Sequence, residues 1–479
     1  MKLLGASLAF SNITPQNDYE FSKFLNKFVT PSEPITTPDR LFGREDELKR
    51  ASRALLDPGK QVFIIGERGV GKTSLANIVA SFYQSSDSEP IKTSCAEDTN
   101  YKTLISDVVI KALNRSKLNE ISIKQNKGLS LPILSKLTAN FSKEVSTKEK
   151  DVYHQINTVA DALTLLQELS QIHSDSPIII VDELDRIDKN NIRPLSDIIK
   201  GISDQKINIK FIFTAVSKTY EQIFSEHEST RRQLEIIELP VLSWDSRIEL
   251  IEKTLNNFEI SIDRTTAIRI SAISDGYPHY IHFVLKQLLW NIFENEEIIT
   301  AIDMTDYNIA LNHVVKQLSP EYSLKYNRSI NTKKIDCELV LWSTSIGEWI
   351  INSLDEMYEA YLEIVYLLRD DQHIPLERAK FNSIVREFTK PNKGMILVPS
   401  HSGRRGEYEF SEKIFKGYIR IQAELHSISI KGIDEKGLIK PVLTQWSSIP
   451  LARTGYYQSK QPQGYPRRSS VFGTYENID

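Results

Sequence analysis

The stretch from Gln61 to Thr73, QVFIIGERGVGKT, decides the fold of this chain. Residues 61–65 form a short apolar, β-branched run, which is typical of a buried parallel strand. Residues 66–73 fit the phosphate-loop pattern GxxxxGK followed by Ser or Thr, and residues 74–80, SLANIVA, continue with helical periodicity. The motif requires this strand, loop and helix, because its glycines let backbone N–H groups turn toward phosphate at a helix N-terminus. The stretch therefore predicts an α/β fold with a parallel sheet and a phosphate-binding loop.

The same loop predicts ATP and Mg²⁺ as cofactors. The Lys72 ammonium is expected to contact the β and γ phosphates, and the Thr73 hydroxyl is expected to hold Mg²⁺. The rest of the loop and the first helical turn supply the other expected phosphate contacts, which are Gly66, Gly69, Val70, Gly71 and Ser74.

A second apolar strand, residues 177–181, ends in two carboxylates, Asp182 and Glu183. Asp182 at the strand's end can support the Mg²⁺ ion, and Glu183 can polarise an attacking water. A kinase of small molecules would not require that second carboxylate, so the pair predicts ATP hydrolysis. Asp185 and Arg186 are explained equally well as a surface ion pair at the start of a helix.

A third apolar strand, residues 210–217, ends in hydroxyl side chains. In an ATPase sheet, the strand beside the Asp182 strand often places a polar side chain near the γ phosphate. Thr214 and Ser217 are both candidates for that position. A threonine chosen for its β-propensity, followed by a serine in a turn, would give the same pattern.

Composition and charge describe an ordinary soluble globular protein. The chain has 479 residues with 59 basic and 63 acidic side chains, which predicts about three domains and excludes a polycation that binds nucleic acid along its length. Cys95 and Cys337 lack metal-ligand spacing, so neither a zinc site nor a disulfide scaffold is expected. Two widely separated cysteines are typical of a reducing compartment, so the protein is expected to be cytoplasmic. Because no apolar run reaches about 18 residues, no membrane-spanning helix is expected.

The C-terminal part contains the signature of a winged helix. An amphipathic helix begins at Asp355, a second is expected over residues 377–388, and strands over 394–398 and 407–410 flank a polar tip. The second helix could enter a DNA major groove while Arg404 and Arg405 reach phosphate. Such domains also serve protein contacts alone, and this alternative stays open.

Together these pieces resemble the AAA+ ATPases, within the group that joins origin-recognition-like ATPases to the STAND signalling ATPases. Residues 41–48, LFGREDEL, are similar to the entry segment of that group, where a Gly-Arg turn lies against the adenine. The resemblance implies that Phe42, Gly43 and Arg44 belong to the nucleotide site. It implies an α/β P-loop sheet with a helical lid, followed by an α+β winged-helix domain.

Two further sites come from the resemblance. Arg231 and Arg232 stand where these ATPases carry an arginine finger for a neighbouring subunit, although an arginine pair is also typical of a solvated face. The Gly276-Tyr277-Pro278 turn resembles the one that opens the second lid helix, whose N-terminus faces the phosphates. Pro278 and His279 are therefore candidate nucleotide contacts, with helix capping as the alternative for His279. The sensor arginine of the wider AAA+ pattern is not found at this turn.

The expected organisation has five parts. They are an N-terminal arm (1–40), a P-loop ATPase core (41–240) with a polar, lysine-rich insertion (114–151), a helical lid (241–320), a winged-helix domain (321–430) and a flexible tail (431–479).

Two functions fit this organisation. The first is a STAND-like switch whose nucleotide state controls homo-oligomerisation and a partner protein effector, for example in phage defence. The second is a DNA-associated ATPase that acts as a loader or target selector, as origin-recognition-like and transposition-regulator ATPases do. The slightly acidic overall charge and the Gly276–Pro278 turn favour the switch, whereas Arg404, Arg405 and the insertion favour the loader. A metabolic kinase is disfavoured by Glu183 and by the lack of a substrate domain.

Overall fold

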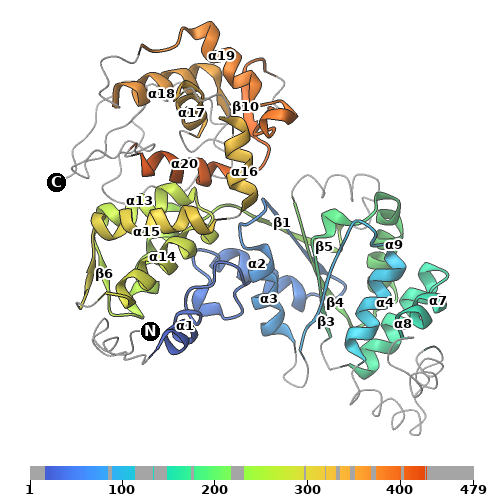
Figure 1. Ribbon diagram of the computed structural model, residues 1–479. Coiled ribbons are helices and arrows are strands. Elements are labelled where there is room, and N and C mark those ends of the chain that lie inside the picture. Colours follow the sequence, from blue (N-terminus) through green and yellow to red (C-terminus); the bar gives the residue numbers. More distant parts are fainter. Residues whose placement is uncertain are drawn as a thin grey trace. The chain divides into compact units, whose positions relative to one another are not determined.

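The computed structural model (Figure 1) describes residues 17–84, 89–113, 133, 148–173, 177–216, 231–295, 298–318, 320–330, 335–345, 351–367, 374–400, 404–426 and 428. The chain divides into two compact units, Pro34–Leu239 and a discontinuous one made of Met1–Glu33 with Pro240–Asp479. Most of the predicted insertion, Ser217 and the predicted tail lie outside the described residues. The five-part division therefore stays a prediction.

The continuous unit is built on a five-stranded sheet in which every pair of neighbouring strands is parallel. Its strands are β1 (Gln61–Gly66), β2 (Ile91–Ser94), β3 (Ile178–Asp182), β4 (Lys210–Ala215) and β5 (Leu234–Leu239), in the order β2-β3-β4-β1-β5. Because the carboxyl ends of parallel strands share one edge, the loops after β1, β3 and β4 meet there. This arrangement confirms the predicted α/β P-loop sheet.

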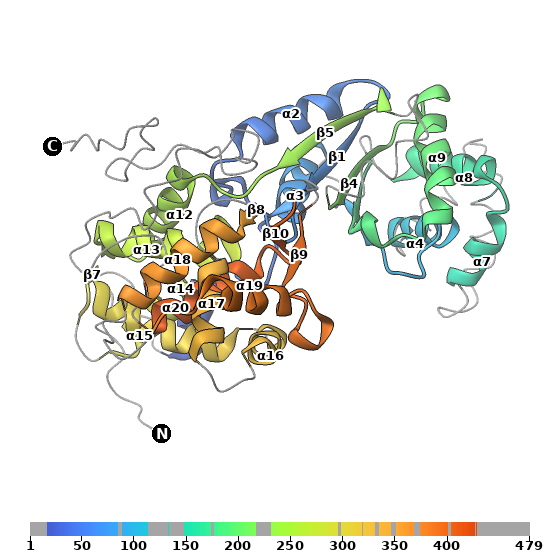
Figure 2. The same cartoon turned by 90° about the horizontal axis from the view of Figure 1, so that it is seen from above.

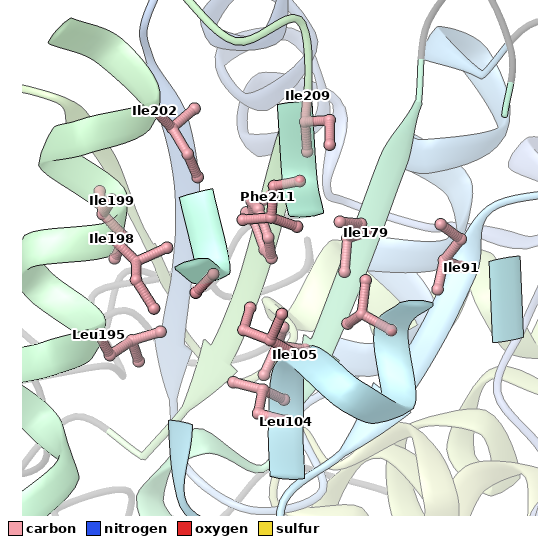
Figure 3. Packing of buried hydrophobic residues seen from close by; sticks show 14 of the residues in the cluster. Ile91, Leu104, Ile105, Ile179, Leu195, Ile198, Ile199, Ile202, Ile209 and Phe211 are labelled. Carbon is pink, nitrogen blue, oxygen red and sulfur yellow. The ribbon is translucent and has the colours of Figure 1, made fainter. Parts of the chain in front are cut away.

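Helices cover both faces of this sheet, as the near-continuous apolar strands require. The helices are α2 (Glu45–Leu56), α3 (Lys72–Tyr83), α4 (Tyr101–Ala112), α7 (Lys148–Gln155), α8 (Val159–Ile172) and α9 (Ile192–Asp204). The two views show α4, α7, α8 and α9 together beyond one face of the sheet (Figures 1 and 2). On that face Ile179 and Phe211 pack with Ile105 and Ile198 (Figure 3). The alternate strand residues, such as Ile64, are also fully buried, so the opposite face is covered too.

The discontinuous unit begins with α1 (Asp18–Leu25) and continues after β5 with a group of helices. They are α12 (Trp244–Asn256), α13 (Arg264–Ser274), α14 (Pro278–Phe293) and α15 (Met304–Gln317), with the short strands β6 (Ser261–Ile262) and β7 (Ala301–Ile302) pairing between them. The fully buried Phe21 of α1 stacks on Phe293 with ring centroids 4.2 Å apart and meets Trp290 edge-on at 4.8 Å. Part of the predicted N-terminal arm is therefore a packed helix.

The last part of the chain alternates helices with a small sheet. Its elements are α16 (Pro320–Ser329), α17 (Ile335–Thr344), β8 (Ile351–Ser353), α18 (Leu354–Leu367), α19 (Arg378–Glu387), β9 (Leu397–Pro399), β10 (Glu407–Phe410) and α20 (Phe415–Leu425). The three strands form an antiparallel sheet in the order β8-β10-β9. The two predicted helices and two predicted strands are present, with ends shifted by up to three residues. The assignment of this part to the winged-helix class stays a prediction.

A buried ion cluster holds α20 against α13 and α17 within the discontinuous unit. The Arg420 guanidinium donates to Asp275 Oδ1 at 2.5 Å, to the Ala272 carbonyl at 2.9 Å and to the Ser345 carbonyl at 3.0 Å. Lys416 Nζ lies 3.6 Å from Asp275 Oδ2. Arg420 and Asp275 are 1% and 0% exposed, so their charges are neutralised by each other and by Lys416 rather than by water.

No helix in the described part of the chain combines the length and apolarity that a membrane crossing needs.

Candidate nucleotide site

The loop between β1 and α3 has the backbone that phosphate binding requires. Gly71, the residue before α3, adopts a left-handed conformation with φ 100°, which favours glycine. A Cβ on Gly66 would lie 2.5 Å from the Leu239 carbonyl oxygen, so only glycine allows β5 to approach this closely. A Cβ on Gly71 would meet nothing within 4 Å, so the space beside this residue, directly before α3, is open. Unpaired N–H groups at a helix N-terminus facing such space suit an anion.

Lys72 lies within this loop. Its ammonium donates to the carbonyls of Gly66 at 3.1 Å and Glu67 at 2.9 Å. Burial lowers the pKa of Lys72, and the charges of Asp185 and Asp182 oppose that shift. The sheet edge therefore holds a cation among carboxylates, as the motif predicts.

Thr73 and Asp182, which are far apart in the sequence, are hydrogen-bonded partners. The Thr73 hydroxyl donates to Asp182 Oδ2 at 2.8 Å. A hydroxyl and a carboxylate are hard oxygen donors that fit Mg²⁺, which binds few protein ligands and completes its shell with water and phosphate. Within the described residues, no group of three or more His, Cys, Asp or Glu side chains forms a separate metal site.

Thr214 also reaches Asp182. Its hydroxyl, which is fully buried, donates to Asp182 Oδ1, and the Glu183 N–H donates to Thr214 Oγ1 at 3.2 Å and to Asp182 Oδ1 at 3.1 Å. Of the two hydroxyls that the sequence left open, Thr214 is thus at the site, and Ser217 lies outside the described residues.

Glu183 has a left-handed backbone, with φ 53° and ψ 43°. A residue with a Cβ pays roughly 1–2 kcal/mol for this conformation, so surrounding contacts must hold it. The Glu183 carboxylate lies 3.3 Å from the Arg186 guanidinium, and both side chains are about two-fifths exposed. Asp185 accepts a hydrogen bond from the Val216 N–H at 3.2 Å.

The sequence interpretation of Asp185 and Arg186 as a mutual surface pair differs from these contacts. Arg186 pairs with Glu183, three residues before it, and Asp185 pairs with the backbone just after β4. The spacing Glu-x-x-Arg was a signal for the first contact. The second joins two distant segments and had no local signal.

The predicted entry segment lies against the phosphate loop. Arg44 is 3% exposed, and its guanidinium lies 3.5 Å from the Val70 carbonyl oxygen and 3.8 Å from Glu47. Burial lowers the pKa of Arg44 to about 10. Just before this segment, the Ile35 N–H donates to Ser74 Oγ at 3.0 Å. These contacts bring Arg44 and Ser74 together with the loop. Adenine contact by Phe42, Gly43 and Arg44 stays a prediction.

Arg231 and Arg232 lie at the other edge of the sheet. They precede β5, whose first residue, Leu234, pairs with Gln61 at the start of β1, whereas the phosphate loop follows the end of β1. A strand of six residues separates the two edges by roughly 17 Å. Both arginines are exposed.

The predicted lid turn belongs to the discontinuous unit. Pro278 is the first residue of α14, and Nδ1 of His279 lies 2.8 Å from the Pro31 carbonyl oxygen. Burial lowers the pKa of His279. The His279 ring is therefore hydrogen-bonded to Pro31, in the segment that follows α1. Contact of Pro278 and His279 with nucleotide stays a prediction.

The sheet order, the phosphate loop and the Thr73–Asp182 pair together define a P-loop protein of the α/β class. Residues 40–212 match the family model described as "AAA ATPase domain". The matched residues, fewer than half of the chain, are similar to that domain, and the chain is an ATPase. Nucleotide binding follows from that family.

Solved structures of similar fold have low sequence identity to this chain. A Walker-type ATPase of Pyrococcus abyssi is 14% identical, with a TM-score of 0.47, over 81% of this chain and 99% of that one. The ORC2 protein of Aeropyrum pernix is 14% identical, with a TM-score of 0.44, over 83% and 98%. The RuvB Holliday junction branch migration motor of Thermotoga maritima is 14% identical, with a TM-score of 0.37, over 80% and 97%. At these TM-scores the likenesses carry no argument about function. No curated protein matches the sequence.

Proposed function

We propose that this ATPase is a molecular switch whose ATP-bound state drives self-assembly and thereby controls a partner effector protein. The observation that carries the proposal is the position of Arg231 and Arg232, at the edge of the sheet opposite the phosphate loop. An arginine there can act on a nucleotide only when another subunit presents its own loop.

The proposed hydrolysis uses residues at the carboxyl edge of the sheet. Lys72 binds the phosphates, and Thr73 and Asp182 hold Mg²⁺, which neutralises phosphate charge when bound. Glu183 orients the attacking water and accepts its proton. Thr214 completes the polar wall opposite the loop, where it already bonds Asp182.

The neighbouring subunit supplies the remaining cation. An arginine aimed at the transferred phosphoryl group neutralises charge that develops in the transition state and is worth ~10³-fold or more in rate. Assembly and hydrolysis are then coupled, because a subunit without a neighbour lacks this group. A defence role against phages rests on the resemblance to the STAND group, and the effector is a separate protein.

DNA association is the second candidate function. The element order α17-β8-α18-α19-β9-β10 is compatible with the predicted winged helix, and α19 exposes Lys380, Ser383 and Arg386 on its surface. Arg404 and Arg405 are exposed beyond β9. Against this, Glu407 lies 3.9 Å from Arg404, so part of the positive charge is neutralised. Because Glu407 neutralises part of the charge of Arg404, DNA association is the second candidate and the switch is the first.

Glu183→Gln with Mg-ATP tests both candidates. The substitution is expected to retain ATP and to lower turnover by ~10²-fold or more, which traps the ATP state. The solution mass is measured with and without duplex DNA, and Lys72→Ala, which should not bind ATP, is the control. Assembly with ATP alone supports the switch, and assembly only with DNA supports the second candidate. A mass that ATP never changes contradicts the proposal.

Mixing variants tests whether the arginines act on a neighbour. The double variant Arg231→Ala/Arg232→Ala is expected to lose turnover by about 10³-fold while it still binds ATP. Mixing it with Glu183→Gln should restore part of the turnover, because one subunit brings the intact site and the other the arginines. Arg193→Ala, an exposed arginine on α9, is the matched control. No recovery on mixing would contradict action between subunits.

A further inference from the structure

The segment after β3 is tied to the end of β4 and to the residue that follows it by hydrogen bonds at Glu183 and at Asp185. The Asp182 carboxylate and the Thr214 hydroxyl both accept from the Glu183 N–H, at 3.1 and 3.2 Å. The Asp185 carboxylate accepts from the Val216 N–H at 3.2 Å. The chain is thus anchored at the Glu183 N–H and again at Asp185, two residues later, and the second anchor has no role in the chemistry proposed above.

These anchors bear on the backbone of Glu183. Its left-handed φ of 53° is unfavourable for a glutamate, so the conformation persists only where neighbouring contacts fix the chain. The turn of Leu184–Arg186 follows at once, and the Arg186 N–H donates to the Glu183 carbonyl at 3.0 Å. If the turn were released at Asp185, the backbone of Glu183 could relax and its carboxylate would point elsewhere.

We propose that Asp185 is a positioning residue that holds Glu183 in the orientation needed to activate water. It acts by anchoring the turn after Glu183 to the backbone that follows β4. This inference rests on the proposed role of Glu183. It gives a function to Asp185, which the sequence alone explains equally well as a member of a surface ion pair.

The Asp185 carboxylate has a second property that the experiment must separate from anchoring. Its charge is the foremost of four carboxylate charges that raise the pKa of Lys72 against burial. A role through charge would act on phosphate binding at Lys72. A role through the hydrogen bond would act on the orientation of Glu183, and so on kcat.

Two substitutions separate the hydrogen bond from the charge. Asp185→Ala removes both and is expected to lower kcat about 10- to 100-fold with little change in KM for ATP, because a displaced catalytic group slows the chemical step. Asp185→Asn keeps an acceptor oxygen for Val216 and is expected to restore kcat to within about threefold of the native enzyme. If both variants lose kcat equally, or KM changes instead, anchoring is contradicted.

A double-mutant cycle tests whether Asp185 acts through Glu183. In a Glu183→Gln background, Asp185→Ala is expected to have no further effect on the residual turnover, because residues that act as a unit are not additive. Full additivity would overturn the proposal. Asp188→Ala is the matched control, since Asp188 is an exposed acid three residues further on that accepts bonds from Asn190 and Asn191.

The experiments distinguish a failure of the proposed Glu183 role from a failure of the Asp185 role. Native turnover in Glu183→Gln would remove the proposed role of Glu183 and this inference with it. Lost turnover in Glu183→Gln together with native kcat in Asp185→Ala would leave the role of Glu183 intact and overturn only the positioning role of Asp185.

Discussion

Lys210 is a buried lysine. In the described part of the chain, the hydrogen bonds of its ammonium all go to backbone carbonyls. At the start of β4 and 7% exposed, it donates to the carbonyls of Asp57 at 2.5 Å and Lys60 at 2.9 Å. Asp57 follows the last residue of α2, so the cation lies where that helix leaves carbonyls unpaired. Burial lowers the pKa of Lys210 to about 8, and the charge of Asp57 opposes the shift.

The lowered pKa of Lys210 predicts a pH dependence of stability. Between about pH 8 and the ordinary lysine pKa of ~10.4, the unfolded chain binds a proton at Lys210 that the folded chain has released. The unfolding free energy should therefore rise with pH in this window, by at most about 1.4 kcal/mol per pH unit for this group. Urea unfolding of native protein and of Lys210→Met should show this rise only in the former. Parallel stability–pH profiles for native protein and Lys210→Met would contradict a lowered pKa of Lys210. Lys200→Met, an exposed lysine on α9, controls for the loss of a lysine charge.

At the scale of residues, the sequence predicts what a motif encodes. The positions of Lys72, Thr73 and Asp182 follow from the loop pattern and from the strand before Asp182, because parallel strands bring their carboxyl ends together. The choice between Thr214 and Ser217 depends on strand register, which a short apolar run leaves undetermined. The bond from Val216 to Asp185 and the burial of Lys210 arise from tertiary packing, so no local pattern signals them.

At the scale of elements, the helix α1 shows how packing decides a segment that the sequence describes only as an arm. Phe21, Phe24 and Leu25 recur at helical spacing, and Asn17 caps the helix by accepting from the Glu20 N–H. Phe24 meets Phe258 edge-on, with centroids 5.2 Å apart, on the same unit that buries Phe21. The periodicity was a signal for the helix, but nothing local identified the surface that receives it.

Removing the Phe21 ring is expected to release α1. A fully buried phenylalanine replaced by alanine costs about 3–5 kcal/mol, which is more than a short helix can replace from its own bonds. Phe21→Ala should therefore make residues 18–25 susceptible to limited proteolysis and alter the fluorescence of Trp290, whose ring Phe21 contacts. Tyr19→Ala, on the same helix but 77% exposed, should leave both signals unchanged. Equal proteolysis of the two variants would contradict the packing role.

At the scale of the whole molecule, the ion cluster of Asp275, Lys416 and Arg420 joins two segments that are far apart in the sequence, the end of α13 and α20. Asp275 ends α13 in a left-handed conformation directly before the Gly276 turn, and Arg420 reaches it from α20. The Tyr280 hydroxyl adds a bond of 2.8 Å to the Ile414 carbonyl. The cluster therefore bonds α13 to α20, the last described helix, within the discontinuous unit.

Breaking this cluster is expected to destabilise the discontinuous unit. Arg420→Met removes the guanidinium that pairs with the buried Asp275 carboxylate and should lower the unfolding free energy by about 3–5 kcal/mol. Denaturant unfolding measures the loss. Arg378→Met, which breaks the more exposed pair with Asp355, should cost about 1 kcal/mol or less. Similar losses for the two arginine substitutions would contradict a special role for the buried pair.

The placement of α1 has a consequence for how the chain is made. Synthesis proceeds from the N-terminus, so the continuous unit, Pro34–Leu239, is complete before α12 or α14 exists. The apolar side of α1, including Phe21, must wait for Trp290 and Phe293, which takes tens of seconds at about 5–20 residues per second. During that time a nascent chain presents an uncovered aromatic surface, and transiently exposed apolar surface of this kind promotes aggregation. The burial of α1 therefore depends on residues translated about 270 positions later, Trp290 and Phe293 of α14.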